Sequence, residues 1–287
     1  MTTLPDATTT GESLVLVRTG RNADLREERA ATSTLGLEFR PGSQPAFSLA
    51  LTYFNTRFRD RIGLPPTSND VLTNPAFSDL VLRSFTEEQL AATCRVANFV
   101  GYAGMECTRI PVAAIVDVRV RNTAYVRTHG VDLNAEHHWQ LDRHTLRLGL
   151  QGTYIFSFKE AESDRLPAHE RVSTQNNPID LRLEGALDWS FRRLTTNLRW
   201  HYYDNYRNVA DTPARRVNAW STFDLRLAYR LSEEALAPFS GTTFALGIEN
   251  VFDTSAPFLN NPVGVGYDQE NGDLTGRMIS LGFRKTW

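Results

Sequence analysis

Residues 146–156 read LRLGLQGTYIF, and this stretch decides the fold because its side chains alternate strictly. Every second position is leucine, tyrosine or phenylalanine, apart from Gly152, and Arg147, Gln151 and Thr153 lie between them. A period of two places successive side chains on opposite faces of a β-strand. The segment is therefore predicted to be a strand with one apolar face and one more polar face.

The same alternation returns along the chain. It is clear in eight further segments, and a weaker tenth case follows the N-terminus: 33–40, 47–54, 130–139, 181–189, 194–203, 223–229, 244–249 and 279–287, then 13–17. Across the nine clear strands the apolar face carries only two ionisable residues, His137 and Lys285, whereas the opposite face carries fifteen. This asymmetry predicts an all-β, antiparallel protein of about ten strands.

Composition narrows the class of protein. The 287 residues contain 31 Lys and Arg against 33 Asp and Glu, a net charge of -2 that argues against a dedicated nucleic-acid binder. No run of about 18 apolar residues occurs, which excludes a transmembrane α-helix. A transmembrane β-barrel stays open because its strands need only about 9–11 residues, every second one polar. A soluble β-sandwich also alternates and is the other possibility.

The connections favour the barrel. Short turns at 41–46, 141–143, 191–193 and 231–241 alternate with longer connections, which include 61–128, 157–179, 205–216 and 253–275. Short turns at one rim and long loops at the other are typical of outer-membrane barrels, and the aromatic residues of the apolar face gather near both rims. We therefore expect an antiparallel transmembrane β-barrel segment with long extracellular loops.

Two regions depart from the strand pattern. Ser84-Phe85-Thr86-Glu87 has the form of a capping box before EEQLAATCRVANF, which predicts one short helix inside the long extracellular loop 61–128. The first 17 residues lack the basic region and apolar core of a secretory signal. Residues 1–12 are expected to be a disordered N-terminal segment, and 13–287 to form the barrel.

Several motifs occur in the order found in one family. NADLREE at 22–28 resembles the loop pattern N-P-x-L-x-P-E without its prolines, and GVDL at 130–133 resembles a G-[IV]-[DE]-L strand start. WSTFDL at 220–225 and GIENVFD at 247–253 resemble the third-last strand and the N-[LV]-F-D signature. Over roughly 13–287 the chain thus resembles the C-terminal half of the barrel of a TonB-dependent outer-membrane receptor.

The chain ends in LGFRKTW, with Ile279, Leu281, Phe283 and the terminal Trp287 in an alternating pattern. This resembles the C-terminal signal that such barrels present to the barrel assembly machinery. Phe is the usual last residue, and Lys285 occupies a position that is usually apolar. We expect these four residues to form the assembly signal.

The resemblance implies a function and a place in the cell. Family receptors have a barrel of about 22 strands around a plug and import a scarce nutrient such as a siderophore, cobalamin or carbohydrate. The plug, the TonB box and the signal peptide have no counterpart here, so we expect a truncated or fragment chain that is inactive alone, with free edges at 13–17 and 279–287. The implied partners are outer-membrane lipid, a small-molecule nutrient, and the TonB energy-coupling complex through the missing plug only.

Enzymatic chemistry is the competing interpretation. Glu136 and His138 share the polar face, and Arg182, Glu184 and Asp188 lie on a neighbouring strand. They form either an acid–base or metal constellation, as in outer-membrane hydrolases, or ladder pairs that any polar barrel lining needs. No HExxH, G-x-S-x-G or P-loop motif occurs. We expect no enzyme, no metal and no cofactor; the alternative is an independent ten-stranded barrel with a structural, adhesive or hydrolase role.

The long loops hold the remaining candidates. Cys94 and Cys107 are too few for a disulfide scaffold and lack zinc-site spacing. Because the implied extracellular loop is oxidising territory, we expect a disulfide between them, with two buried thiols as the alternative. Six aromatic or charged loop residues are candidates for either ligand contact or loop self-packing: Tyr102, Arg109, Tyr203, Tyr206, Phe258 and Tyr267.

Overall fold

The structure is a computed structural model that describes residues 2–6, 8–9, 11–42, 46–65, 71–74, 77–95, 106–122, 125–161, 167–232, 239–260 and 265–285. The chain divides into two compact units. The first unit contains residues 1–31, 57–126 and 160–169, and the second contains residues 32–56, 127–159 and 170–287.

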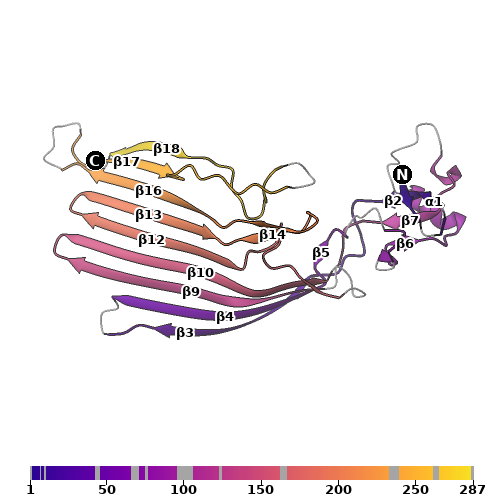
Figure 1. Cartoon of the computed structure of the whole chain (residues 1–287), viewed down its shortest axis with the longest axis horizontal. Coiled ribbons are helices and arrows are strands. Elements are labelled where there is room, and N and C mark those ends of the chain that lie inside the picture. The colour runs from indigo at the N-terminus through magenta and orange to yellow at the C-terminus, as the bar shows by residue number, and fades with distance from the viewer. Residues whose placement is uncertain are drawn as a thin grey trace. The chain divides into compact units, whose positions relative to one another are not determined.

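A ten-stranded sheet dominates the chain (Figure 1). Along its path the strands are β18 (Met278–Lys285), β17 (Thr242–Glu249), β16 (Trp220–Arg230), β13 (Leu194–Tyr203), β12 (Leu181–Phe191), β10 (His144–Ala161), β9 (Tyr125–Leu141), β4 (Phe47–Arg59) and β3 (Arg29–Phe39). The tenth strand, β11 (His169–Glu170), pairs with β10 beside this path. Among the described residues, β3 and β18 do not pair with each other, so the sheet is open.

The register fixes which side chains share a face. Six aliphatic residues stand opposite one another on successive strands from β10 to β18: Leu148, Leu187, Leu198, Leu225, Ile248 and Ile279. The predicted apolar face is therefore confirmed as one continuous surface. Leu281 and Phe283 on it are 84% and 80% exposed. Exposed apolar area costs about 25 cal/mol per Å² in water, so this face is suited to an apolar environment.

A second row runs across the same strands beside the short turns. It consists of His144, Phe191, Leu194, Tyr229, Phe244 and Phe283, each opposite the next. His144 stacks on Phe191 with ring centroids 4.3 Å apart, and Trp189 lies nearly parallel to Phe191. We call this row the short-turn aromatic row.

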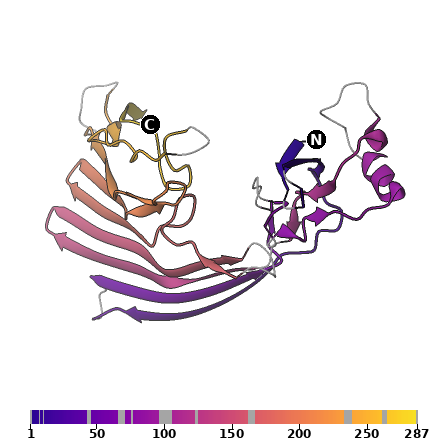
Figure 2. The ribbon, with the colours of Figure 1, turned by 45° about the vertical axis from the view of Figure 1, so that its right-hand side comes forward.

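The first unit is built around a four-stranded sheet in the order β1 (Thr2–Pro5), β2 (Glu12–Arg18), β7 (Ala114–Asp117) and β6 (Val81–Leu82), shown near the N-terminus in Figure 2. β2 and β7 are parallel, and Val15 stands opposite Ala114. Val15 packs in one apolar cluster, while Leu16 packs with Leu90 and Ile115 in another. The sheet is thus buried on both faces.

Two expectations for the N-terminus differ from this arrangement. Residues 13–17 form a strand, but it belongs to the small sheet and is not the tenth strand of the large one. Apolar side chains on both faces of this strand are buried, whereas a strand of the large sheet has one apolar and one polar face. Residues 1–12 include β1, which pairs antiparallel with β2, so they are not a wholly disordered segment. Of the expected free edge 279–287, residues 279–285 belong to the terminal strand β18, and 286 and 287 lie outside the described residues. The other end of the path is β3, not 13–17.

The predicted loop helix is present as α1 (Glu87–Arg95), with a different cap. The Thr86 hydroxyl accepts the Gln89 amide at 3.2 Å, and the Gln89 side chain accepts the Thr86 amide at 2.8 Å. The capping box is therefore Thr86–Gln89, not Ser84–Glu87. Residues 96–99 of the predicted helix lie outside the described residues. None of the helices in the described part of the chain has the length and apolarity needed to cross a membrane.

A buried ion pair joins the N-terminal segment to the rest of the first unit. Asp6 has a side chain only 1% exposed and accepts both terminal nitrogens of Arg83, at 2.9 and 3.0 Å. The Arg83 guanidinium, together with hydrogen bonds from Thr8 and Ser13, holds the pKa of the Asp6 carboxyl well below its usual range. Paired in this way, a buried carboxylate stays charged.

Smaller elements complete the two units. In the first, β5 (Ile62–Gly63) pairs with β8 (Arg121–Asn122), and a 3₁₀ turn spans Cys107–Arg109. In the second, β14 (Tyr206–Asn208) pairs with β15 (Arg215–Val217) beyond the end of β13. β9 begins at Tyr125, three residues before the predicted end of the long loop 61–128.

Cys94 of α1 and Cys107 of the 3₁₀ turn are bonded to each other in the structure, with Cα atoms 5.8 Å apart. We predict the same bond in protein taken from the bacterial envelope, because an exported loop folds in an oxidising compartment. Mass spectrometry should detect a peptide pair joined through these residues, and alkylation should require prior reduction. Free alkylation of both thiols would contradict the extracellular placement of the loop or its oxidised state.

Candidate functional site

Three long connections meet at the long-loop end of the large sheet, and Asp268 ties the first of them to the last. This carboxylate is 1% exposed. It accepts the backbone amides of Asn176 at 3.0 Å and Glu270 at 2.9 Å, and the side-chain amide of Asn271 at 2.9 Å. A buried carboxylate with three donors fixes the positions of the groups that donate to it.

Arg182 links this loop cluster to the sheet. It is the second residue of β12, at the long-loop end of the strand, and donates a hydrogen bond to the side-chain oxygen of Asn271. Its guanidinium carbon lies 5.5 Å from the ring centre of Tyr203, which in turn stacks on Trp220 at 4.8 Å. Among the described residues, Arg182 forms no ion pair, so its positive charge is not neutralised by a carboxylate.

An apolar cluster supports the loops from behind. Ile179, Tyr206, Val217 and Leu259 come from all three connections and are buried together. Burial, with the negative charge of Asp268 nearby, raises the pKa of the Tyr206 hydroxyl. The loops are therefore packed against one another and carry a core of their own.

A further polar anchor is Asn208, which is 1% exposed. Its side-chain amide donates to the Asn260 carbonyl at 2.8 Å and to Asp211 at 3.2 Å. Because Asn208 lies in β14 and Asn260 in the last long loop, this contact ties two of the three connections at a second point. The loop arrangement is thus held by side chains that are separated by about 50 to 90 residues.

A cleft of about 420 Å³ opens between these loops and the polar face of the sheet. We call it the loop-end cleft; its lining residues are Thr153, Ile155, Asn176, Asn177, Pro178, Ile179, Arg182, Glu270 and Asn271. Amide groups, the Arg182 guanidinium and the Glu270 carboxylate make it a hydrogen-bonding site, with apolar contact from Ile155, Pro178 and Ile179. Such a lining recognises a ligand and orients it.

The six residues proposed from the sequence for ligand contact lie in different parts of the structure. Tyr203 and Tyr206 lie in the support of the cleft, and Phe258 is 79% exposed. Arg109 belongs to the other unit, where it pairs with Glu106, and Tyr102 lies outside the described residues. Tyr267 is half-buried in the last long loop.

The residues that organise the cleft, Asp268, Asn271 and Asn176, were not singled out from the sequence. The run Asp268–Asn271 has a visible signal, because Asp and Asn side chains favour turns by accepting nearby backbone amides. The sequence does not show that this turn also reaches a loop 92 residues away.

The charged constellation on the polar face is a ladder of ion pairs. Arg147 contacts Glu136 at 2.6 Å and Asp188 at 4.0 Å, and Arg199 contacts Asp188 at 2.8 Å. Glu136 also contacts His138. Carboxylates engaged in this way act as cross-strand pairs. This arrangement corresponds to the ladder pairs of a polar barrel lining, one of the two interpretations given for these residues.

Arg182 does not belong to this ladder and contacts Asn271 at the loop-end cleft. Among the described residues, Glu184 forms no ion pair with either set. The sheet nevertheless places Glu184 opposite His201 on β13 and Gln151 on β10. It is therefore part of the same polar face.

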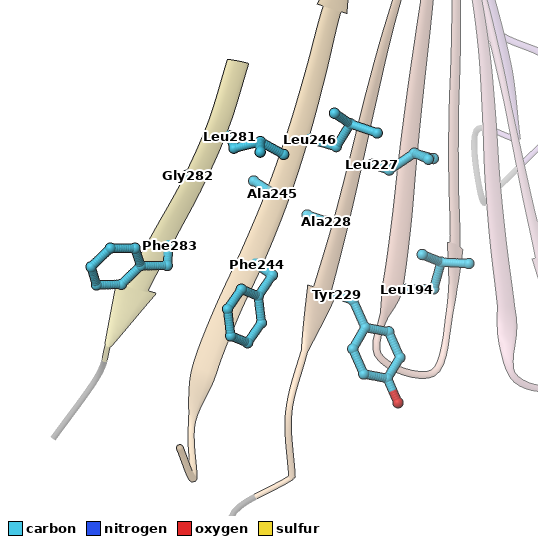
Figure 3. A pocket seen from close by; sticks show the side chains of 10 residues that line it. All are labelled: Leu194, Leu227, Ala228, Tyr229, Phe244, Ala245, Leu246, Leu281, Gly282 and Phe283. Carbon is cyan, nitrogen blue, oxygen red and sulfur yellow. The ribbon is translucent and has the colours of Figure 1, made fainter. Parts of the chain in front are cut away.

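A second hollow, of about 390 Å³, lies on the apolar face where β16, β17 and β18 run side by side (Figure 3). Its lining consists of leucine, alanine, glycine, phenylalanine and tyrosine side chains. Ile279, Leu281 and Phe283 of the predicted assembly signal stand on this face, opposite Ile248, Leu246 and Phe244. Trp287 lies outside the described residues, and the role of the four residues in assembly stays a prediction.

Replacing Asp268 with alanine is expected to loosen the loop cluster by about 2 kcal/mol, because three donors lose their acceptor in a buried place. Hydrogen exchange of the Arg207 amide, which donates to the Ser173 carbonyl at 2.9 Å, should become about 30-fold faster. Asp273→Ala is the matched control, since in the described part of the chain Asp273 accepts hydrogen bonds only from the backbone and side chain of Thr275. Equal effects of the two variants would contradict the central role of Asp268.

Comparison with known proteins agrees with this architecture. Residues 5–251 match the family described as TonB dependent receptor-like, beta-barrel. No curated protein gives a significant match. Solved structures with similar folds include a mutant ferric enterobactin receptor, PfeA, from Pseudomonas aeruginosa (TM-score 0.55, 14% identity) and the siderophore receptor PirA from Acinetobacter baumannii (0.56, 13%). The outer membrane transporter YddB from Escherichia coli is similar as well (0.55, 13%).

The matches cover 92%, 97% and 93% of this chain but only 32%, 34% and 34% of those proteins. The chain therefore spans about a third of the length of the receptors that it resembles. At these identities the structural likeness establishes the fold, and the match over 5–251 establishes the family. On both grounds, the chain belongs to the β-barrel family of TonB-dependent receptors of the outer membrane.

Proposed function

We propose that the chain forms the C-terminal barrel part of a TonB-dependent receptor in the cell outer membrane, where it takes part in importing a scarce nutrient. The observation that carries the proposal is a single sheet with a continuous exposed apolar face, an ion-paired polar face, and a cleft at its long-loop end. A sheet built this way separates lipid from a polar lumen.

The open sheet sets the role of the 287 residues within such a receptor. Nine strands follow one another along the path, and the tenth, β11, has two residues. Closure as an independent ten-stranded barrel requires β3 to pair with β18, and the described residues do not pair in that way. We therefore favour a barrel part that acts together with further strands and a plug, over a separate structural, adhesive or hydrolytic barrel.

The proposed partners follow from the two faces. Lipid covers the apolar face, the assembly machinery recognises the end at Ile279–Trp287, and energy from the TonB complex reaches the receptor through a plug. The nutrient enters from the long-loop side and meets the loop-end cleft. The Arg182 guanidinium and three asparagine side chains favour a ligand rich in oxygen atoms, and an anionic group of that ligand would pair with Arg182.

Arg182→Gln tests the cleft directly. The variant removes the positive charge and keeps a hydrogen-bonding side chain, so binding of an anionic ligand should weaken about tenfold. Binding is measured by tryptophan fluorescence, because Trp220 lies one ring away from Arg182. The probes are a ferric catecholate, cobalamin and a maltooligosaccharide, applied to the full chain in detergent.

Arg215→Gln is the control, since the Arg215 side chain is 80% exposed and outside the cleft. It should leave binding unchanged. The proposal for the cleft fails if none of the probes binds, or if both variants weaken binding equally.

A further inference from the structure

We propose that the short-turn rim of the large sheet binds the phosphodiester headgroup of an anionic phospholipid through Arg143, Arg192 and Arg193. The inference rests on the proposed function, because it requires the apolar face to lie in a membrane. The proposed lipid site lies at the short-turn end of the sheet, whereas the loop-end cleft lies at the long-loop end.

Backbone geometry brings the three arginines together. Arg143 precedes β10, and Arg192 and Arg193 form the turn between β12 and β13. The Arg192 amide donates to the Arg143 carbonyl at 3.4 Å, and His144 stands opposite Phe191 in the register. On the other side, the Arg230 amide donates to the Arg193 carbonyl at 3.0 Å. The two neighbouring turns therefore present their arginines at one place.

Within the described part of the chain, the positive charges of these arginines are not paired with carboxylates, unlike those of the arginines on the polar face. All three are exposed, and among the described residues none forms an ion pair. On the polar face, by contrast, Arg147 and Arg199 each contact a carboxylate. Asp142 lies beside Arg143 in the first turn, so the two turns carry three guanidinium groups against one carboxylate. An excess of exposed guanidinium groups attracts an anion, and the planar guanidinium fits phosphate oxygens in pairs.

The short-turn aromatic row indicates which kind of anion the arginine cluster binds. The Arg192 guanidinium carbon lies 5.2 Å from the ring centre of Phe191, and His144 stacks on the same ring. The charged cluster thus adjoins rings that belong to the apolar face. Free phosphate uses only the arginines, whereas a phospholipid places its phosphate on them and its acyl chains along the apolar surface.

The row continues across the sheet in the direction of β18. Figure 3 shows Leu194, Tyr229, Phe244 and Phe283 side by side on one face, with Leu227, Leu246 and Leu281 in the next row. Aromatic side chains at this level are typical of the boundary between headgroups and hydrocarbon. The arginines lie one step beyond the row, at the level that the phosphates of that leaflet occupy.

The experiment measures which lipid lies next to Trp189, whose ring is parallel to that of Phe191. The full chain with Trp189 as its single tryptophan is reconstituted in equimolar phosphatidylglycerol and phosphatidylcholine vesicles, with brominated chains on one lipid or the other. We expect bromines on phosphatidylglycerol to report about threefold enrichment over phosphatidylcholine. Arg143→Gln, Arg192→Gln and Arg193→Gln together should abolish the preference and keep the total quenching.

The matched control removes three positive charges from the other unit, with Arg18, Arg95 and Arg109 changed to glutamine, and should keep the preference. Equal quenching by both lipids in the unaltered arginine background overturns the lipid site and leaves the proposed function intact. Quenching by neither lipid shows that the apolar face does not meet hydrocarbon, which overturns both. Should the tryptophan substitutions impair insertion, mass spectrometry of lipid retained by the unmodified chain in mild detergent gives the same comparison.

Discussion

The 287 residues expressed alone with a secretion signal are expected to give no energy-dependent uptake of any nutrient. Nine path strands leave the sheet open, and outer-membrane transporters of this kind enclose their lumen with about 22 strands around a plug. An open sheet exposes the unpaired edges of β3 and β18, which hydrocarbon does not tolerate. The chain should then reach the outer membrane without transporting, or aggregate.

Uptake is measured with a radiolabelled ferric siderophore, and with cobalamin as a second probe, in a strain deleted for its own receptors. Supplying the plug and the remaining strands of a family receptor together with this chain is the arrangement in which we expect transport. Deleting the energy-coupling complex provides the control. Uptake by the 287 residues alone that disappears with this deletion would contradict the proposed role as a barrel part.

Leu148→Arg is expected to destabilise the folded chain in lipid by about 2–4 kcal/mol, because the new cation points into hydrocarbon. Leu148 lies four residues along β10 from His144 of the short-turn aromatic row, roughly 13 Å along the strand. With the usual strand tilt this is roughly 10 Å along the membrane normal, close to the middle of an apolar band about 25 Å tall. Unfolding in urea from lipid vesicles measures the loss.

Arg147→Leu, one residue earlier, is the matched substitution on the polar face. It should cost about 1 kcal/mol or less, since the Arg147 side chain is half exposed and its contacts are shared. Glu136 keeps His138, and Asp188 keeps Arg199. If Arg147→Leu proved the more damaging of the two, the apolar face would not be the one in contact with lipid.

The large sheet was predictable because its signal is local. A period of two assigns each side chain to a face, and each short turn then sets the register of its hairpin, as for Leu187 opposite Leu198. The strand at 13–17 lacked that signal. Its run of apolar residues is buried on both sides in a small sheet, and no alternation tells which partner it takes.

The loop-end cleft was beyond prediction for another reason. Arg182 was recognised as a polar-face residue, but its partner Asn271 lies 89 positions later in the sequence. Contacts between irregular loops follow from the packing of a few side chains, such as Asp268 on Asn176, and no period in the sequence records them. The helix cap shows the same limit at short range, because two overlapping Ser/Thr-x-x-Glu/Gln patterns, Ser84–Glu87 and Thr86–Gln89, compete within six residues.

The parallel pairing of β2 with β7 has a consequence for the order of assembly. Val15 and Ala114 are separated by 99 positions, so their contact closes a long loop and is entropically costly to form first. β1 pairs with β2 locally, and β3 with β4, within a few residues of chain. Folding of the first unit should therefore be slow and late. One edge of β2 stays unpaired until β7 is available, and β7 follows the whole β3–β4 hairpin in the chain.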